Sequence, residues 1–90
     1  MPLLVVRHRV KDFAAWKQVF AEHGPKRDGA DFSNPRIYRS ASDPNEVVIL
    51  IDAASIEKAR AFGSSDETRA QMAKAGVIDQ PTVYFLNEAS

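Results

Sequence analysis

The sequence predicts an α+β domain in the order β-α-β-β-α-β, with a four-stranded antiparallel sheet and both helices on one face of it. Two observations predict this class. Short segments in which apolar side chains alternate with a period of two are interspersed with segments that have the 3.6-residue period of amphipathic helices, and turn residues separate them. The chain has 90 residues, which is enough for one hydrophobic core, so residues 1–90 are expected to form a single domain.

The first strand and the first helix are predicted near the N-terminus. Residues 3–10 alternate as a strand whose helix-facing side would carry Leu4, Val6, His8 and Val10. Asp12 is a candidate N-cap, because its carboxylate can accept from a free amide of the first helical turn. The helix that follows would hold one set of side chains within a single arc: Phe13, Trp16, Val19, Phe20 and His23. Gly24 and Pro25 are expected to break or kink it, and residues 26–35 are expected to be the longest irregular segment.

A hairpin is predicted next. Residues 36–40 alternate as a strand, and residues 43–45 (DPN) favour a turn, because proline presets φ and Asp and Asn tolerate turn geometry. Residues 47–51 are apolar on both faces of the strand they form. This pattern is typical of a central strand in a sheet that is covered on both sides.

The second helix and the last strand complete the pattern. Ser55 is a candidate N-cap for a helix over residues 56–62, which Gly63 and Ser64 are expected to interrupt. Ser65 or Asp66 can then restart a helix that Gly76 would close in the left-handed conformation. Pro81 is expected to open a strand over residues 82–87. The resulting order is the ferredoxin-like arrangement.

The open face of the sheet predicts self-association. Two helices cover one face only, so the other would expose Val5, Ile37 or Tyr38, alternate residues of 47–51 and part of the last strand. Such a patch is larger than a monomer usually shows. We therefore expect a two-fold homodimer formed through the open sheet face.

Composition excludes several classes. Twelve basic and twelve acidic residues give no net charge, which argues against a nucleic-acid partner. The longest apolar run, residues 47–51, is too short for a membrane span, so a cytoplasmic location is expected. The chain lacks cysteine, and its two histidines cannot supply three imidazole ligands, so no metal site is expected.

Several stretches together resemble the dimeric α/β-barrel superfamily, close to the antibiotic biosynthesis monooxygenase domains and to small proteins labelled cyclases. They are residues 10–16 (VKDFAAW), Phe20, His23, 36–39 (RIYR), 43–47 (DPNEV), 59–62 (ARAF), Met72, 75–77 (AGV) and Pro81. The resemblance covers nearly the whole chain. It implies a homodimer with a pocket under each sheet. The superfamily includes cofactor-independent monooxygenases, haem-degrading enzymes and polyketide cyclases.

Two histidines are the candidate catalytic residues. His23 belongs to an otherwise aromatic and aliphatic arc, and an imidazole with a pKa near neutrality suits a general base. The alternative is that His23 satisfies carbonyls in the last turn of its helix. His8 shares the helix-facing side of the first strand and could approach Trp16 or His23. Its alternative role is that of a hydrogen-bonded residue at the strand end.

Four aromatic residues are candidates for substrate binding. Trp16 and Phe20 could form the pocket wall, and Tyr38 and Tyr84 could each hold a phenolic or enolic substrate oxygen. All four could instead be packing residues.

These features lead to three functional hypotheses. The first is a homodimer that binds a compact hydrophobic or aromatic molecule and oxygenates an activated phenol or quinol without a cofactor. The second is a lyase similar to polyketide cyclases, in which the same base acts on a carbon acid and a tyrosine orients the enolate. The third is a non-catalytic ligand-binding or assembly module, which an entirely apolar pocket would favour.

Overall fold

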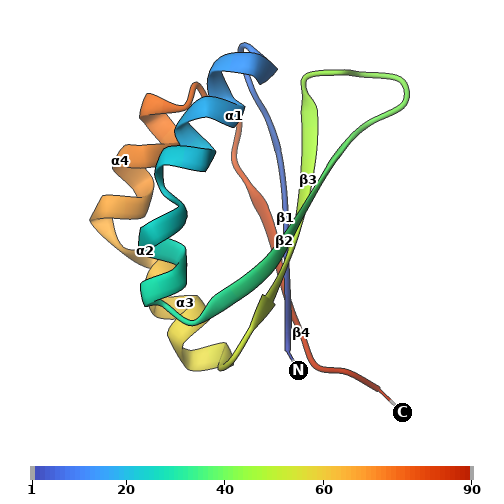
Figure 1. The fold of residues 1–90 in the computed structure, drawn as a ribbon. Coiled ribbons are helices and arrows are strands. Elements are labelled where there is room, and N and C mark those ends of the chain that lie inside the picture. Colours follow the sequence, from blue (N-terminus) through green and yellow to red (C-terminus); the bar gives the residue numbers. More distant parts are fainter. Residues whose placement is uncertain (1, 90) are drawn as a thin grey trace.

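A four-stranded antiparallel sheet in the order β2-β3-β1-β4 carries all the helices on one face (Figure 1). The computed structural model describes residues 2–89. The elements are β1 (Leu3–Arg9), α1 (Phe13–Glu22), α2 (Gly24–Gly29), β2 (Phe32–Arg39), β3 (Glu46–Ala53), α3 (Ile56–Ser64), α4 (Asp66–Lys74) and β4 (Thr82–Leu86). The predicted α+β, ferredoxin-like arrangement is confirmed, with each predicted helix present as a pair of shorter ones.

The register of the strands assigns each side chain to one of two faces. His8 lies opposite Val47, Val6 opposite Ile49 and Leu4 opposite Ile51, so these residues point toward the helices. All six are buried. The predicted face of the first strand is therefore confirmed, and β1 and β3 are the two central strands.

The segment after the first helix differs from the sequence prediction. Asp12 caps α1, its Oδ1 accepting from the amide of Ala14 at 3.3 Å, and the chain turns at His23. It then forms α2 where an irregular segment was expected. That prediction was wrong because proline is compatible with the first turn of a helix, where its missing N–H needs no partner, so Gly24 and Pro25 begin a second helix.

The strand β2 also begins earlier than expected, at Phe32. It includes Asn34 and Pro35, where the register shifts between Ser33 and Arg36. Asn34 has a φ of 51°, a left-handed conformation that asparagine tolerates. Because β2 is an edge strand, the missing amide of Pro35 removes no essential ladder hydrogen bond.

The second predicted helix is interrupted as expected, at Ser65 rather than at Gly63 and Ser64, and Ser65 is one of the two residues expected to restart it. Ser55 caps α3 through its Oγ, which accepts from the amide of Lys58 at 3.3 Å, and α3 continues through Gly63 and Ser64. The bend occurs at Ser65, whose Oγ accepts from the amide of Thr68 at 3.1 Å and caps α4. A hydroxyl that can cap the next helix places the break more effectively than glycine does. Gly76 follows α4 with a φ of 82°, as predicted.

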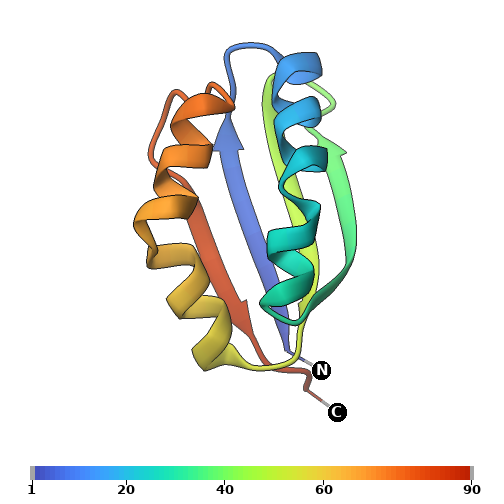
Figure 2. The ribbon, with the colours of Figure 1, turned by 60° about the vertical axis from the view of Figure 1, so that its left-hand side comes forward.

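The two helical pairs lie side by side over the same face of the sheet. In Figure 2, α1 and α2 run alongside β3 and β2, whereas α3 and α4 run alongside β4. An exposed ion pair between Lys26 Nζ and Glu67 Oε1, at 2.9 Å, connects α2 with α4. Within residues 2–89, every helix is too short and too polar to cross a bilayer.

Candidate functional site

A cavity of about 130 Å³ lies between the helices and the sheet, and every helix and strand contributes to its wall. The wall is mainly aliphatic and aromatic: Leu4, Val6, Trp16, Val19, Phe20, Phe32, Ile49, Ile51, Ala59, Phe62, Met72, Ala75, Val83 and Phe85. Gly63 also contributes to this apolar wall. A few polar groups also line it: His8, His23, Arg27, Thr68 and Gln71. A buried cavity of about 150 Å³ is large enough to bind benzene, so this one has room for a single aromatic ring.

His8 reaches the cavity from the central strand β1. The residue is only 2% exposed, and both ring nitrogens are buried without a hydrogen-bond partner. Its ring packs edge-on against Trp16, with the centroids 5.7 Å apart. A hydrogen-bonded strand-end histidine, the alternative considered for this residue, is not what the structure shows. Because buried polar atoms are normally paired, two unpaired nitrogens beside a cavity are an unusual feature of this protein.

His23 reaches the same cavity from the junction of α1 and α2. Its Nε2 is buried and has no partner, and its ring lies 5.8 Å from that of Phe62 on α3. The side chain makes no capping hydrogen bond to α2. The two histidines therefore line one cavity from opposite layers, one from the sheet and one from the helices.

Both imidazoles favour the neutral form. Burial is the main cause that lowers the pKa of His8 below its ordinary value of 6.5, although the charge of Asp79 acts in the opposite direction. Burial also lowers the pKa of His23, with the nearby charges of Arg27 and Lys26 adding to the effect and Glu67 opposing it. At neutral pH both rings can therefore accept a proton from a ligand.

Replacing His8 by leucine is expected to stabilise the empty protein. Leucine has a similar volume and removes two buried, unpaired nitrogens, so we expect His8→Leu to raise the free energy of unfolding by about 1–2 kcal/mol at pH 7. The depressed pKa of His8 also makes the unfolded state bind more protons below pH 6.5. Stability of the wild type should therefore fall as the pH drops below that value, by up to about 1.4 kcal/mol per pH unit for this group.

Urea unfolding at pH 7 and at several lower pH values, with all proteins at one concentration, measures both effects. The variant should be more stable and should lose stability less steeply on acidification. A His8→Leu protein that is less stable than the wild type at pH 7 would show that His8 has a stabilising partner.

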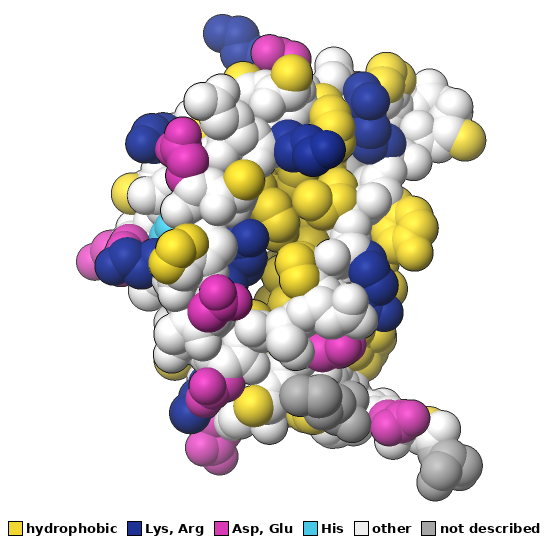
Figure 3. Space-filling view, in the orientation of Figure 1, with side chains coloured by type: hydrophobic (Ala, Val, Ile, Leu, Met, Phe, Trp, Pro, Cys, Tyr) yellow, Lys and Arg dark blue, Asp and Glu magenta, His cyan; other side chains and the backbone are white. Residues whose placement is uncertain are grey.

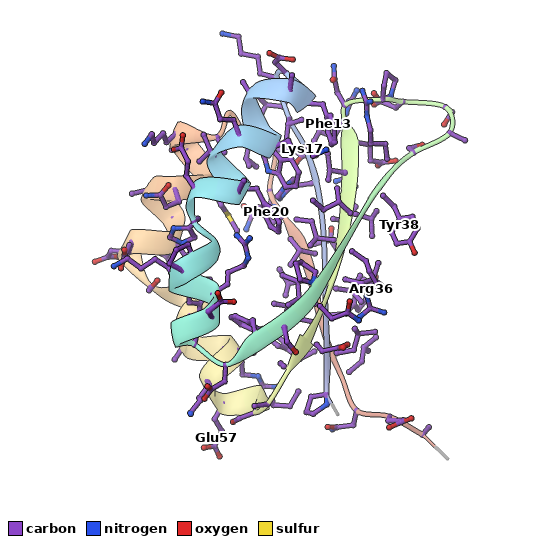
Figure 4. All side chains as sticks on the ribbon, viewed as in Figure 1. Phe13, Lys17, Phe20, Arg36, Tyr38 and Glu57 are labelled. Carbon is purple, nitrogen blue, oxygen red and sulfur yellow. The ribbon has the colours of Figure 1, made fainter. Side chains whose placement is uncertain are left out.

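A stack of aromatic rings on α1 forms one wall. Trp16 is 2% exposed and lies between Phe13 and Phe20, with centroid distances of 5.7 and 5.0 Å. In Figure 4, Phe13 and Phe20 extend from α1 toward the sheet. Phe20 contacts the cavity, whereas Phe13 lies behind Trp16 and is absent from the wall. The predicted helical arc therefore supplies both the core and the cavity lining.

Arg27 on α2 gives the wall its one permanent charge. Its guanidinium carbon lies 3.6 Å from the centroid of Phe20, and its Nη1 donates to the carbonyl oxygen of Phe20 at 2.7 Å. The lining contains no Asp or Glu. In the part of the chain from residue 2 to 89, no three His, Asp or Glu side chains gather in a way that could hold a metal ion.

Comparison with solved structures shows which proteins share this architecture. A protein of Bordetella bronchiseptica, provisionally assigned as an antibiotic biosynthesis monooxygenase, superposes with a TM-score of 0.81 at 14% identity, covering 99% of this chain and 97% of its own. A second such protein, from Caulobacter crescentus, gives 0.76 at 18% identity, covering 99% and 90%. SnoaB, a cofactor-independent oxygenase from Streptomyces nogalater, gives 0.71 at 14% identity, covering 98% and 94%. No protein-family model and no curated protein matches the sequence.

The chain has the antibiotic biosynthesis monooxygenase fold. The likeness spans almost the full length of each chain, so it covers both the helical layer and the sheet. The structural resemblance inferred from residues 10–16, 36–39 and 43–47 is confirmed at the level of the fold.

The predicted site residues fall into two groups within this fold. His8, His23, Trp16 and Phe20 all line the cavity. Tyr38 and Tyr84 lie on the other face of the sheet, 57% and 55% exposed. Figure 4 shows Tyr38 pointing away from the helices. Within one chain, neither tyrosine can contact a ligand in the cavity.

Sequence analysis overlooked three polar groups of the wall, which are Arg27, Thr68 and Gln71. Arg27 was missed because residues 26–35 were expected to be irregular. A signal for it exists, since Phe20, His23 and Arg27 have the spacing of three and four residues that places side chains on one helical face.

Proposed function

We propose that this protein binds a compact, electron-rich aromatic molecule in the cavity and oxygenates it without a cofactor, as a homodimer. The observation that carries the proposal is the pair of imidazoles whose buried, unpartnered nitrogens line an apolar cavity. The likeness to SnoaB, a cofactor-independent oxygenase, supports the reaction type.

The first step is removal of a phenolic proton by His8 or His23. Both rings have lowered pKa values and are neutral at pH 7, so each can act as the base. A phenolate carries negative charge on its ring carbons and can transfer an electron to O₂. The apolar wall keeps water from the radical and peroxide species that follow.

The remaining steps need no external reductant. The phenoxyl radical and superoxide combine to form a C–O bond at the ring carbon, giving a peroxide. The imidazolium returns its proton to the distal peroxide oxygen, the ring carbon loses its hydrogen as a proton, and the O–O bond breaks. One oxygen atom becomes a quinone carbonyl and the other leaves as water, so a phenol and O₂ give a quinone and H₂O.

The open face of the sheet supports the proposed dimer. Its apolar side chains form a continuous patch across all four strands: Leu3, Val5, Tyr38, Val48, Leu50, Tyr84 and Leu86. In the register, Val5 lies between Leu50 and Tyr84. Such a patch usually marks an interaction surface. Two copies pressed together through it would each shield the face that the helices leave uncovered.

Charges at the margin of this face are already neutralised within the chain. Arg7 pairs with Glu46 at 2.7 Å and with Asp79 at 2.9 Å, and Arg36 pairs with Asp52 at 2.7 Å. Arg9 pairs with Asp43, in the turn before β3. Covering the face would not bury an uncompensated charge from these groups.

The two alternatives receive less support from the geometry. The cyclase hypothesis used Tyr38 or Tyr84 to orient an enolate, and both are on the opposite face of the sheet from the cavity. The non-catalytic module would be favoured by a wholly apolar pocket, whereas this wall includes two imidazoles, a guanidinium, Thr68 and Gln71.

Incorporation of labelled oxygen tests the proposal. Purified protein is incubated with hydroquinone and related monocyclic phenols under ¹⁸O₂, and the products are analysed by mass spectrometry. We expect a quinone that carries one ¹⁸O atom, formed at a rate proportional to protein concentration, and no product without O₂. Formation of unlabelled quinone with hydrogen peroxide, at the rate seen without protein, would contradict oxygenation.

A further inference from the structure

Arg27 occupies an unusual position for a charged side chain. It is half-buried and lines a mainly apolar cavity, and within residues 2–89 no carboxylate forms an ion pair with it. In contrast, Arg7 and Arg36, which belong to the open face of the sheet, each form an ion pair with a carboxylate. Arg27 therefore lines the cavity with its charge unpaired.

Most of the hydrogen-bonding capacity of Arg27 is unused. A guanidinium has five N–H donors, and the hydrogen bond to the Phe20 carbonyl uses one of them. Stacking at 3.6 Å over the Phe20 ring, together with this bond, fixes the plane of the group. A planar donor held in this way suits two oxygen atoms of an anion better than it suits bulk water.

The electrostatics of the wall favour a negative ligand. Burial lowers the pKa of Arg27, and only the charge of its sequence neighbour Asp28 opposes that effect, yet a guanidinium remains protonated at physiological pH. The two histidines are neutral and the lining has no acidic residue. The cavity wall thus carries a net charge of one positive unit.

We infer that the guanidinium of Arg27 pairs with an anionic oxygen of the aromatic ligand, which is either a carboxylate or the phenolate that forms in the cavity when an imidazole removes its proton. The inference rests on the proposed function, since it assumes an aromatic ligand, and it names the class: an aromatic acid or an ionised phenol. In the proposed reaction, Arg27 stabilises the phenolate once an imidazole has removed its proton.

The surface around this part of the molecule agrees with an anionic ligand. Figure 3 shows hydrophobic side chains in a hollow between α1–α2 and β2, bordered by Lys and Arg side chains. Arg39 of β2 lies over Phe13 at 4.1 Å from the ring centroid, as Arg27 lies over Phe20. Arg39 also donates to a backbone carbonyl, from Nε to Pro44 O at 2.8 Å, but it is absent from the cavity wall. It is therefore a matched control.

Two pairs of probes of nearly equal shape test the inference. Benzoate is compared with benzamide, and ionised 4-nitrophenol with 4-nitroanisole, so that one arm reports a carboxylate and the other a phenolate. Binding is followed by titration calorimetry and by the fluorescence of Trp16, the one tryptophan of the chain, which lines the cavity. The proteins are the wild type, Arg27→Gln, Arg27→Lys and Arg39→Gln.

The wild type should bind at least one anion about 10–100-fold more tightly than its neutral partner, as expected for a charge-assisted hydrogen bond. Arg27→Gln should abolish that preference with little change for the neutral probe, Arg27→Lys should retain part of it, and Arg39→Gln should retain it in full. A preference for the carboxylate alone or for the phenolate alone supports the inference and identifies the ligand group.

Two results would overturn the inference while leaving the proposed function intact. One is equal binding of charged and neutral probes to the wild type, and the other is an anion preference that survives in Arg27→Gln. If none of the four probes binds, both the inference and the aromatic ligand of the proposed function are wrong.

Discussion

Substituting both imidazoles with leucine, as His8→Leu together with His23→Leu, should lower the rate of oxygen uptake about 10²–10⁴-fold, the range expected for loss of a general base. The structural reason is that these are the two proton acceptors of the cavity wall with buried, unpaired nitrogens and lowered pKa values. Because leucine removes unpaired polar atoms, the double variant should remain folded, which separates loss of chemistry from loss of structure.

The pH profile of the wild type provides a second readout. The base must be neutral, so kcat/KM should rise with pH through an apparent pKa below 6.5 and become level near pH 7. The two rings share one cavity, so this value belongs to the pair. The oxygen-uptake rates of the two single variants, His8→Leu and His23→Leu, show which imidazole is the main base. Lys17→Gln, an exposed change on α1 outside the cavity wall, is the control and should keep the wild-type rate. A double variant that consumes oxygen at the wild-type rate would rule out both histidines as the base.

Placing a charge at the centre of the open face should separate the proposed dimer. Leu50 points outward from β3, in register with Val5 on one side and Arg36 on the other. In a dimer formed face to face, Leu50→Arg would place an additional positive charge from each copy in the shared interface. The repulsion would cost several kcal/mol of association free energy. We expect the dissociation constant to rise by at least about 10³-fold.

Light scattering coupled to size-exclusion chromatography measures the outcome. The wild type should have twice the chain mass of 10.0 kDa at micromolar concentration, and Leu50→Arg should have the chain mass itself. Ala70→Arg introduces the same side chain on the exposed side of α4 and should leave the dimer unchanged. A wild type that elutes with the mass of one chain would refute the dimer directly. Circular dichroism confirms that each variant is folded.

Local patterns were enough to predict most of the fold. Alternation in residues 3–10 and the continuous apolar run of residues 47–51 identified the two strands that lie at the centre of the sheet, because a buried strand face is apolar at every second position and a strand covered on both sides is apolar throughout. Asp12 and Ser55 marked helix starts correctly because capping is a contact within a few residues. Errors arose where two local signals competed. Gly24 and Pro25 break one helix and also begin another, and sequence alone favoured the break.

The candidate site was only partly accessible from sequence. The histidines could be placed on the faces that form the cavity, since strand and helix periods assign faces. Whether their nitrogens would have partners depends on contacts with β3, α3 and α4, which are distant in sequence. The position of Arg27 in the cavity wall depends on α2, a helix that the sequence did not predict. Tyr38 and Tyr84 were candidates by chemistry alone, and the register of the strands puts them on the opposite face.

The irregularity at Asn34 and Pro35 constrains how copies of this chain can meet. An edge strand normally offers a row of free amides and carbonyls to which a further strand can add. Here Pro35 removes one donor, and Asn34, with its left-handed backbone conformation, lies where the strand register shifts. The addition of a further strand next to β2 is therefore obstructed. Lateral polymerisation of the kind that leads to fibrils is therefore discouraged along this edge of the sheet.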